Sequence, residues 1–144
     1  MKRIVVASLA ALALSGCAQF YLAFGIATNE TPVVRVGARE ISAVDPDPLR
    51  FARGQGEVTI TWQLGIGSSN RFAANGITID GDVTKSDRPA PQTEILKCSV
   101  NEDRTRASCL NRNTRPGRYK YTVRLVTADG RALPAFDPLI VNME

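Results

Sequence analysis

The most reactive side chains of this 144-residue chain are its three cysteines, because the sequence contains no histidine. The absence of histidine excludes Ser-His-Asp and Cys-His catalysis, and it removes the commonest zinc ligand. Cys17 stands alone near the N-terminus, whereas Cys98 and Cys109 lie close together in the second half of the chain. We therefore expect separate roles for Cys17 and for this pair.

Cys17 follows the three parts of a secretory signal peptide. Lys2 and Arg3 form a positive n-region, residues 4–14 form an apolar h-region, and residues 15–16 are small. An apolar segment of this length is too short to span roughly 30 Å of hydrocarbon as a helix. The sequence therefore predicts export with a signal peptide over residues 1–16, and no permanent transmembrane helix there.

The run Leu14-Ser15-Gly16-Cys17 resembles the lipobox of bacterial lipoproteins. The resemblance implies that Cys17 receives a diacylglyceryl thioether, that cleavage occurs before it, and that its new α-amine is acylated. Two or more acyl chains anchor a protein firmly, so Cys17 would tether this chain to a membrane. An ordinary signal peptide with an incidental cysteine is the alternative.

The residues after Cys17 bear on where the lipoprotein resides. Ala18 stands where an aspartate would resemble the inner-membrane retention signal of enteric bacteria. The resemblance therefore implies an outer-membrane lipoprotein, with the periplasmic side favoured over the cell surface. We expect a lipidated tether over residues 17–31 and a single domain over residues 32–144. The apolar residues 18–24 lie either in the membrane interface or on the domain, and both alternatives stay open.

The charge of the exported chain limits its partners. Removal of residues 1–16 would leave 128 residues, a length that suits one domain. The formal net charge would fall from +4 to +2, because Lys2 and Arg3 leave with the signal peptide. This mild positive charge is no evidence for nucleic-acid binding, and we expect no nucleic-acid partner.

Cys98 and Cys109 fit a disulfide across a β-hairpin, since exported proteins meet an oxidising compartment. If Asn101 faces Arg106, then Cys98 falls opposite Cys109 and residues 102–105 form a four-residue turn. A bond that closes a loop of about twelve residues contributes roughly 2–3 kcal/mol in the chain-entropy model. A redox pair is the alternative, but such pairs usually have a tighter CxxC spacing, so we favour a structural disulfide.

The elements that position these residues are predicted to be β-strands, and no segment shows a sustained helical period. Residues 57–64 and 118–126 alternate most clearly, and Thr61 and Lys120 should face outward. The inward-facing residues are Val58, Ile60, Trp62 and Leu64 in the first segment and Tyr119, Tyr121, Val123 and Leu125 in the second. Further strands are expected at 33–36, 38–44, 72–79, 94–100, 106–111 and 139–143. Residues 45–48 should form a loop that two prolines make rigid. Short strands at this spacing favour a sandwich with Greek-key connections.

Residues 116–123, Pro-Gly-Arg-Tyr-Lys-Tyr-Thr-Val, resemble the penultimate strand of immunoglobulin-like and fibronectin-like domains, which begins with a Gly-x-Tyr tyrosine corner. Residues 58–64, with Trp62 inward, are similar to an early core strand of the same folds. The resemblance implies an all-β, immunoglobulin-like antiparallel β-sandwich after the signal peptide, and it implies no activity. The chain departs from the family because no cysteine occupies that early strand, and because its disulfide would lie within one hairpin.

Two groups of charged residues are candidates for binding. Five aspartates in turn-like sequences could supply oxygen ligands for calcium, but such sequences also form ordinary turns, so we expect no metal and no cofactor. These are Asp45, Asp47, Asp80, Asp82 and Asp87. Basic residues concentrate around the predicted hairpin and the strand after it. They are Arg104, Arg106, Arg112, Arg115, Arg118 and Lys120. This group forms either a solvated face or a contact surface for an anionic envelope component or an acidic protein.

The sequence therefore predicts a non-catalytic, lipid-anchored envelope protein whose sandwich serves as a binding or assembly module facing the periplasm. A surface-exposed adhesin-like or secretion-associated accessory lipoprotein is an alternative. An enzyme with carboxylates alone, such as a glycan hydrolase with an Asp/Glu pair, is the alternative from another class. The 14 acidic residues permit it, but sandwiches of this size rarely leave a deep cleft. No Gly-x-Ser-x-Gly motif surrounds a serine.

Overall fold

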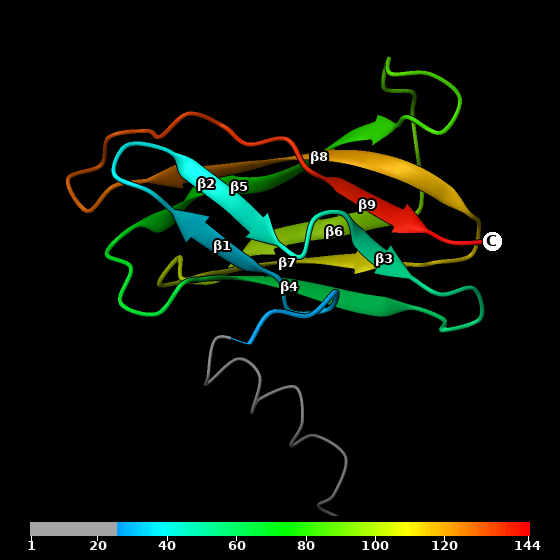
Figure 1. Ribbon diagram of the computed structural model, residues 1–144, viewed down its shortest axis with the longest axis horizontal. Coiled ribbons are helices and arrows are strands. Elements are labelled where there is room, and N and C mark those ends of the chain that lie inside the picture. Colours follow the sequence, from blue (N-terminus) through cyan, green and yellow to red (C-terminus); the bar gives the residue numbers. More distant parts are fainter. Residues whose placement is uncertain (1–25) are drawn as a thin grey trace, which may run out of the picture.

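The computed structural model describes residues 26–144, which fold into two packed β-sheets (Figure 1). Cys17 and residues 18–24 lie outside the described residues, as does the signal peptide. One sheet has the order β2-β1-β4-β7-β6 and the other β3-β9-β8-β5. The strands are β1 (Val33–Val36), β2 (Ile41–Asp45), β3 (Leu49–Phe51), β4 (Val58–Leu64), β5 (Arg71–Asp82), β6 (Ile95–Val100), β7 (Arg106–Asn111), β8 (Gly117–Val126) and β9 (Leu139–Asn142). The predicted all-β sandwich is confirmed.

The order of the strands is immunoglobulin-like. Strands β4, β7 and β6 occupy the positions of B, E and D in one sheet, and β9, β8 and β5 occupy those of G, F and C in the other. Two pairs are parallel, however: β1 with β4 and β3 with β9. Strands β1 and β2 belong to one sheet, and β3 belongs to the other. Alternation of hydrophobic residues predicts a strand, but it does not predict whether that strand runs parallel or antiparallel to its neighbour.

Strand β3 follows the predicted loop at residues 45–48, and no strand was predicted there. The chain leaves the first sheet at Pro46 and Pro48, which cannot donate hydrogen bonds to a ladder. It then joins the second sheet, where Leu49 and Phe51 are fully buried and Leu49 pairs with Ile140. Sequence alternation missed this strand because three residues are too few to show a period.

Trp62 and Tyr121 meet in the centre of the core from opposite sheets. Both side chains are fully buried, and their ring centroids are 5.2 Å apart. The indole Nε1 of Trp62 donates a hydrogen bond of 3.2 Å to the hydroxyl of Tyr121. This bond satisfies two buried polar atoms, and burial raises the pKa of Tyr121. The predicted inward faces of β4 and β8 are therefore confirmed.

The outer faces of these strands are less exposed than alternation suggests. Thr61 and Lys120 point outward as expected, although both are half-buried. Gln63 and Thr122 lie on the same outer faces and are buried. The Thr122 hydroxyl lies 2.8 Å and 2.9 Å from the carboxylate oxygens of two aspartates, Asp80 and Asp137. Neighbouring polar side chains can thus bury a residue that strand alternation places on the outer face.

The Cys98–Cys109 disulfide is present across the β6–β7 hairpin, with the two Cα atoms 4.1 Å apart. The predicted register is also correct, since Asn101 N donates to the carbonyl of Arg106 at 3.0 Å. Lys97 has a positive φ of 55°, and the register shifts by one residue between Leu96 and Ser99. Such a bulge protects the exposed edge of β6 from pairing with another chain.

The Gly-x-Tyr sequence that begins β8 has a steric reason. The Tyr119 side chain folds back over Gly117, so that a Cβ at this position would lie 2.6 Å from the Tyr119 hydroxyl. Only glycine leaves that space. Burial and the nearby carboxylates of Glu94 and Asp82 raise the pKa of Tyr119 to about 12.

Candidate functional site

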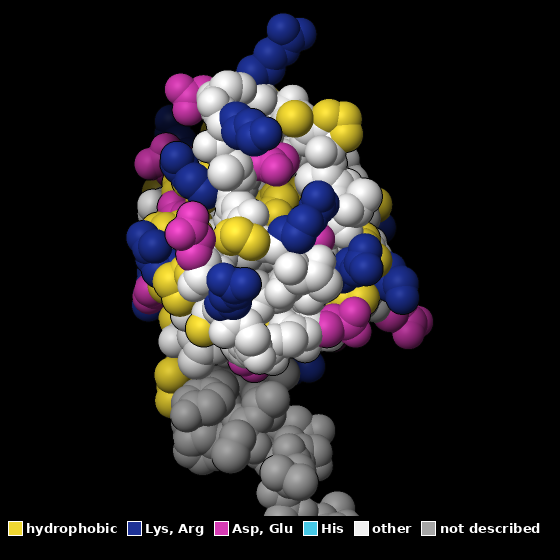
Figure 2. Space-filling model, turned by 90° about the vertical axis from the view of Figure 1, so that its right-hand side faces the viewer, with side chains coloured by type: hydrophobic (Ala, Val, Ile, Leu, Met, Phe, Trp, Pro, Cys, Tyr) yellow, Lys and Arg dark blue, Asp and Glu magenta, His cyan; other side chains and the backbone are white. Residues whose placement is uncertain are grey.

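The structure divides the predicted contact arginines between the two ends of the sandwich. Arg104 and Arg106 lie at the β6–β7 turn, whereas residues 112–118 follow β7 at the other end (Figure 1). The six residues of β7 separate the groups by roughly 17–20 Å. Figure 2 shows the second end, where Lys and Arg side chains are interspersed with acidic and uncharged ones. The five arginines therefore form two groups rather than one patch.

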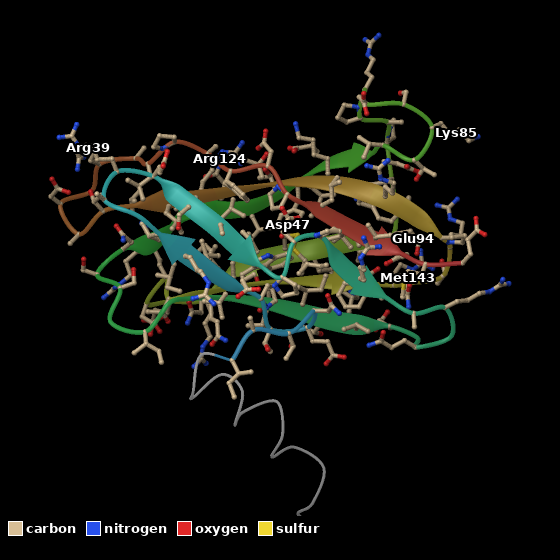
Figure 3. The ribbon with its side chains drawn as sticks, viewed as in Figure 1. Arg39, Asp47, Lys85, Glu94, Arg124 and Met143 are labelled. Atoms are coloured by element: carbon tan, nitrogen blue, oxygen red, sulfur yellow. A yellow bond between two sulfur atoms is a disulfide. The ribbon has the colours of Figure 1, made fainter. Side chains whose placement is uncertain are left out.

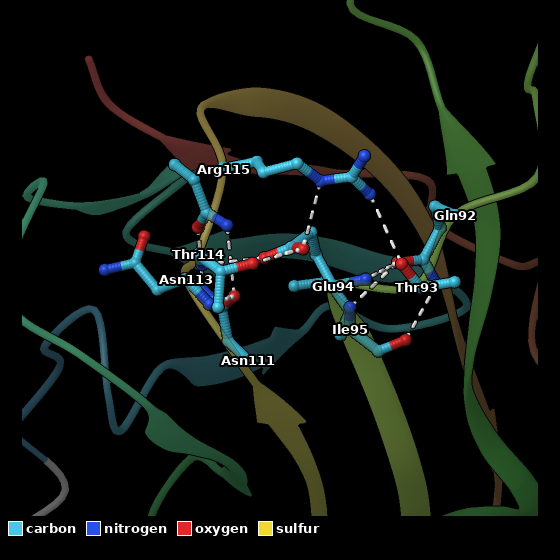
Figure 4. A network of polar contacts seen from close by, with 9 residues as sticks. Gln92, Thr93, Glu94, Ile95, Asn111, Asn113, Thr114 and Arg115 are labelled. Atoms are coloured by element: carbon cyan, nitrogen blue, oxygen red, sulfur yellow. Dashed lines mark hydrogen bonds and ion pairs between the residues drawn. The ribbon is translucent and has the colours of Figure 1, made fainter.

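Arg115 binds a carboxylate within its own chain. Its Nε lies 3.3 Å from Oε1 of Glu94, whose side chain is only 1% exposed (Figure 4). Thr114 donates to the same carboxylate from its backbone nitrogen at 2.8 Å and from its hydroxyl at 2.7 Å. Burial opposes ionisation of Glu94, but the bonds from Thr114 and Arg115 outweigh it and lower the pKa of this carboxyl. Arg115 thus has a structural role.

Further hydrogen bonds close this end, which we call the Glu94 end. The amides of Asn111 and Asn142 bond each other at 2.7 Å and 3.1 Å, and so join β7 of one sheet to β9 of the other. Gln92 accepts bonds from the backbone nitrogens of Glu94 and Ile95. Figure 3 places Glu94 at this end together with Lys85 and Met143. The buried polar groups of Glu94, Asn111 and Asn142 are thus satisfied by the chain itself, whereas the exposed Arg112 and Arg118 form no ion pair among residues 26–144.

The opposite end, which we call the loop end, gathers four connections. These are the β1–β2 turn (37–40), the β4–β5 loop (65–70), the β6–β7 turn (101–105) and the β8–β9 connection (127–138). Arg39 marks this end in Figure 3. The last three connections correspond to the B–C, D–E and F–G loops of an immunoglobulin fold. In antibody variable domains the B–C and F–G loops contact the antigen.

The β6–β7 turn is held firmly at the loop end. Arg104 has a positive φ of 58°, and its carbonyl accepts a hydrogen bond of 2.8 Å from the backbone nitrogen of Phe72 in β5. Asp103 accepts bonds from the hydroxyl of Thr105 at 2.6 Å and from its backbone nitrogen at 3.0 Å. These bonds lower the pKa of Asp103. The acidic residue thus caps its own turn, while the side chain of Arg104 is exposed.

Three grooves at the loop end are lined by the β4–β5 loop, and two of them also include residues at the β6–β7 turn. The Arg71 groove has a volume of about 320 Å³ and the Gln63 groove about 240 Å³. The Arg71 groove is lined by Ser69, Arg71, Arg104, Val126, Thr127, Ala128 and Gly130. The Gln63 groove is lined by Gln63, Leu64, Gly65, Ile66, Gly67, Ser68, Thr105 and Arg106. The β4–β5 loop contributes to both grooves.

The side chains around these grooves are suited to contact another molecule. Arg71, Arg104 and Arg106 are exposed, and none of them forms an ion pair with another residue between 26 and 144. Ile66, in the middle of the β4–β5 loop, is 82% exposed. Arg71 and Ile66 were not among the predicted contact residues. The only sequence signal was a lone large apolar residue between two glycines.

Two carboxylates lie together beside Thr122 and bear on the alternative of a hydrolase. Asp80 and Asp137 share the Thr122 hydroxyl, and Lys120 Nζ lies 3.2 Å from Asp137. Burial opposes ionisation of Asp137, but the bonds from Thr122 and Lys120 outweigh it and lower its pKa. A hydrolase general acid needs a raised pKa, so Asp137 is unsuited to that role. Across residues 26–144, no three His, Cys, Asp or Glu side chains lie together in a way that could hold a metal ion.

Comparison of the sequence with known protein families and with curated proteins finds no match. Among the described residues, no helix has the length and apolar character needed to cross a membrane. The geometry of the loop end is therefore the basis for a functional proposal.

Proposed function

We propose that this chain is a lipid-anchored, non-catalytic binding module of the bacterial envelope, and that its loop end contacts the partner. The anchor rests on the resemblance of residues 14–17 to a lipobox. One observation supports the binding role above all. Three exposed arginines without ion pairs among residues 26–144, Arg71, Arg104 and Arg106, surround a loop whose Ile66 is also exposed.

The proposed partner is an anionic envelope component or the acidic surface of an envelope protein. Guanidinium groups bind carboxylates and phosphates through two parallel hydrogen bonds, which gives both strength and orientation. The acidic residues Asp103 and Asp129 at this end accept bonds from Thr105 and Thr127 in their own turns, so they are engaged locally. Binding should weaken as salt rises, because exposed charges are screened over about 8–10 Å near physiological ionic strength.

Charge reversal at each end tests this proposal. The variant Arg71→Glu/Arg104→Glu changes the loop end, and the matched control Arg112→Glu/Arg118→Glu makes the same change in charge at the Glu94 end. We expect the first variant to lose the partner that co-purifies from cross-linked envelopes, and the control to keep it. Both should remain folded by circular dichroism and should stay in the membrane fraction.

Two outcomes would contradict the proposal. If the loop-end variant keeps every partner and rescues every deletion phenotype, the arginines of this end form only a solvated face. If the control alone loses the partner, the contact surface lies at the Glu94 end. High salt during purification should mimic the loop-end variant.

A further inference from the structure

Ile66 is the most exposed large apolar residue between positions 26 and 144, with 82% of its surface open to solvent. It lies in the β4–β5 loop at the loop end, between Gly65 and Gly67. Neither neighbour has a side chain that could shield it, and Gly67 has a positive φ of 78°, which other residues rarely adopt. The loop therefore presents one bare aliphatic side chain to whatever lies next to this end.

Arginines flank this loop on both sides. The backbone nitrogen of Phe72 donates to the carbonyl of Arg104 at 2.8 Å, which fixes Arg71 and Arg104 as neighbours where the loop ends. Both of them line the Arg71 groove, while Arg106 lines the Gln63 groove together with Ile66. All three arginines are exposed, and none forms an ion pair among residues 26–144. Accessible cations thus lie around an accessible apolar residue.

Acidic residues also lie at the loop end. Asp103 and Asp129 accept hydrogen bonds within their own turns, and Glu40 and Glu102 are exposed in neighbouring turns. The formal charges of this end therefore nearly balance. Its attraction for an anion must act at contact, between a guanidinium and the anionic group, rather than as a field over a long distance.

An anionic phospholipid surface offers both kinds of contact at once. Its phosphate groups lie directly above hydrocarbon, so an aliphatic side chain can enter the interface while guanidiniums around it bind the phosphates. The Arg71 groove of about 320 Å³ and the Gln63 groove of about 240 Å³ have room for single headgroups. The acidic surface of a protein would supply anions, but it would also need a cavity that matches Ile66. The combination therefore favours lipid.

The chain between the anchor and the described residues is long enough for this contact. Residues 17–25 number nine, and they span at most about 32 Å. The backbone nitrogen of Gln63 donates to the carbonyl of Pro32 at 3.0 Å, and Ile66 follows three residues later, which is roughly 10 Å. Residues 26–32 add about 20 Å even if fully extended. The loop end is therefore within reach of the membrane in which the acyl chains would lie.

We propose that the loop end docks on the anionic phospholipid surface of the membrane that anchors the chain. Ile66 enters the interface, and Arg71, Arg104 and Arg106 bind lipid phosphates. A short tether gives an effective concentration on the order of millimolar, so a weak contact is sufficient. Docking directs the Glu94 end away from the membrane. The inference rests on the proposed function, since it names anionic phospholipid as the partner of the loop end.

Vesicles of defined composition test this docking. The mature chain, residues 17–144, carries Cys17→Ser and so has no acyl chain to insert. It is titrated with vesicles of phosphatidylcholine alone and of phosphatidylcholine mixed with phosphatidylglycerol in equal parts, and binding is measured by sedimentation. We expect binding to the mixed vesicles that weakens as salt rises, and at least about tenfold weaker binding to phosphatidylcholine alone.

Substitutions separate the loop end from any contribution of residues 18–24. Ile66→Ser and Arg71→Gln/Arg104→Gln should each weaken binding to the mixed vesicles about tenfold. Met143→Ser and Arg112→Gln/Arg118→Gln make the same kinds of change at the Glu94 end, where Met143 is 39% exposed (Figure 3), and should leave binding unchanged. Circular dichroism should show all four variants folded, because the replaced side chains are exposed.

A fluorophore reports the orientation directly. Ile66→Cys and Met143→Cys, each in the Cys17→Ser chain, supply one free thiol for an environment-sensitive dye. We expect the dye at position 66 to shift to the blue on the mixed vesicles and to be quenched by nitroxide-labelled lipid chains, and the dye at position 143 to do neither. Equal responses at the two positions, or unchanged binding in both loop-end variants, would overturn the inference.

The two proposals can fail separately, because the vesicles contain no protein and the proposed function is tested by recovery of a partner from envelopes. Loss of the partner in Arg71→Glu/Arg104→Glu without vesicle binding would refute this inference alone and would assign the loop end to an acidic protein. Vesicle binding through the loop end, together with a co-purified partner that charge reversal leaves in place, would refute the partner contact of the proposed function alone.

Discussion

Replacement of Glu94 by glutamine tests the buried network that closes one end of the sandwich. The carboxylate accepts bonds from the backbone nitrogen and the hydroxyl of Thr114 and from Nε of Arg115. Glutamine keeps the shape but has one acceptor oxygen and one NH₂ donor. Its NH₂ must therefore face either the Thr114 N–H or the Arg115 Nε–H, both of which are donors.

The expected cost follows from how free each partner is to move. The Arg115 side chain is 66% exposed, so it can turn to water and its loss costs less than about 1 kcal/mol. The Thr114 N–H is fixed by the backbone, so the glutamine should keep its oxygen there and turn its NH₂ toward Arg115. The bond from Thr114 then changes from a charge-assisted one, worth about 1.5–3 kcal/mol, to a neutral one, worth about 0.5–1.5 kcal/mol. We expect Glu94→Gln to destabilise the fold by about 1–2 kcal/mol at pH 7, or roughly 3–8 °C in Tm for a domain of this size.

The stability lost in Glu94→Gln should be larger at neutral pH than at acidic pH. Burial raises the pKa of Glu94, but the bonds from Thr114 and Arg115 outweigh burial and hold it below its ordinary value of 4.5. A lowered pKa in the folded state stabilises the fold above the unfolded-state pKa, and this contribution is lost as pH falls through the folded value. The difference between wild type and Glu94→Gln should therefore be full at pH 7 and should shrink below pH 4.5.

Thermal unfolding followed by circular dichroism at pH 7 and pH 3 measures this difference. Glu57→Gln, at an exposed position just before β4, is the matched control and should change Tm little at either pH. Arg115→Gln should cost less than about 1 kcal/mol. The reasoning fails if Arg115→Gln is as costly as Glu94→Gln, or if the Glu94→Gln difference is the same at both pH values.

Four further variants have expected outcomes. Cys17→Ser should move the protein from the membrane fraction to the soluble or unprocessed form, and unchanged retention with an unchanged mature mass would argue against lipidation. Cys98→Ser/Cys109→Ser should lower stability by about 2–3 kcal/mol, and non-reducing peptide mapping of wild type should find the two peptides joined. Trp62→Ala should cost about 3–5 kcal/mol, because it removes a fully buried indole. Lys120→Ala should cost less than about 1 kcal/mol, and a solvent-like fluorescence maximum for Trp62 would contradict its burial.

Local sequence patterns were sufficient to predict the long alternating strands and the disulfide hairpin. Alternation over 57–64 and 118–126 predicted the faces of β4 and β8, and a four-residue turn fixed the register that joins Cys98 to Cys109. Strand β3 and the two parallel pairs were not predictable in this way. They exist because segments far apart in sequence lie alongside each other, and short strands carry no periodic signal.

The candidate site depended even more on tertiary structure. Nearness in sequence suggested one basic surface from Arg104 to Arg118, but β7 carries the chain from one end of the sandwich to the other between them. The loop end instead combines Arg104 with Arg71, which belongs to another strand of the other sheet. Gln63 lies on the outer face of β4 and is nevertheless buried, because alternation specifies a side of the sheet and not the degree of burial.

The two ends of the sandwich differ in how their polar groups are satisfied. At the Glu94 end, a buried carboxylate takes three bonds from the chain, and the amides of Asn111 and Asn142 complete each other. At the loop end, the amide of Gln63 is buried without a partner, and Arg106 beside it forms no ion pair within residues 26–144. Unsatisfied buried groups cost stability, so they persist where another role compensates for that cost. The guanidinium groups of Arg71, Arg104 and Arg106 are donors without ion pairs among residues 26–144, so a partner that carries carboxylates or phosphates suits this end.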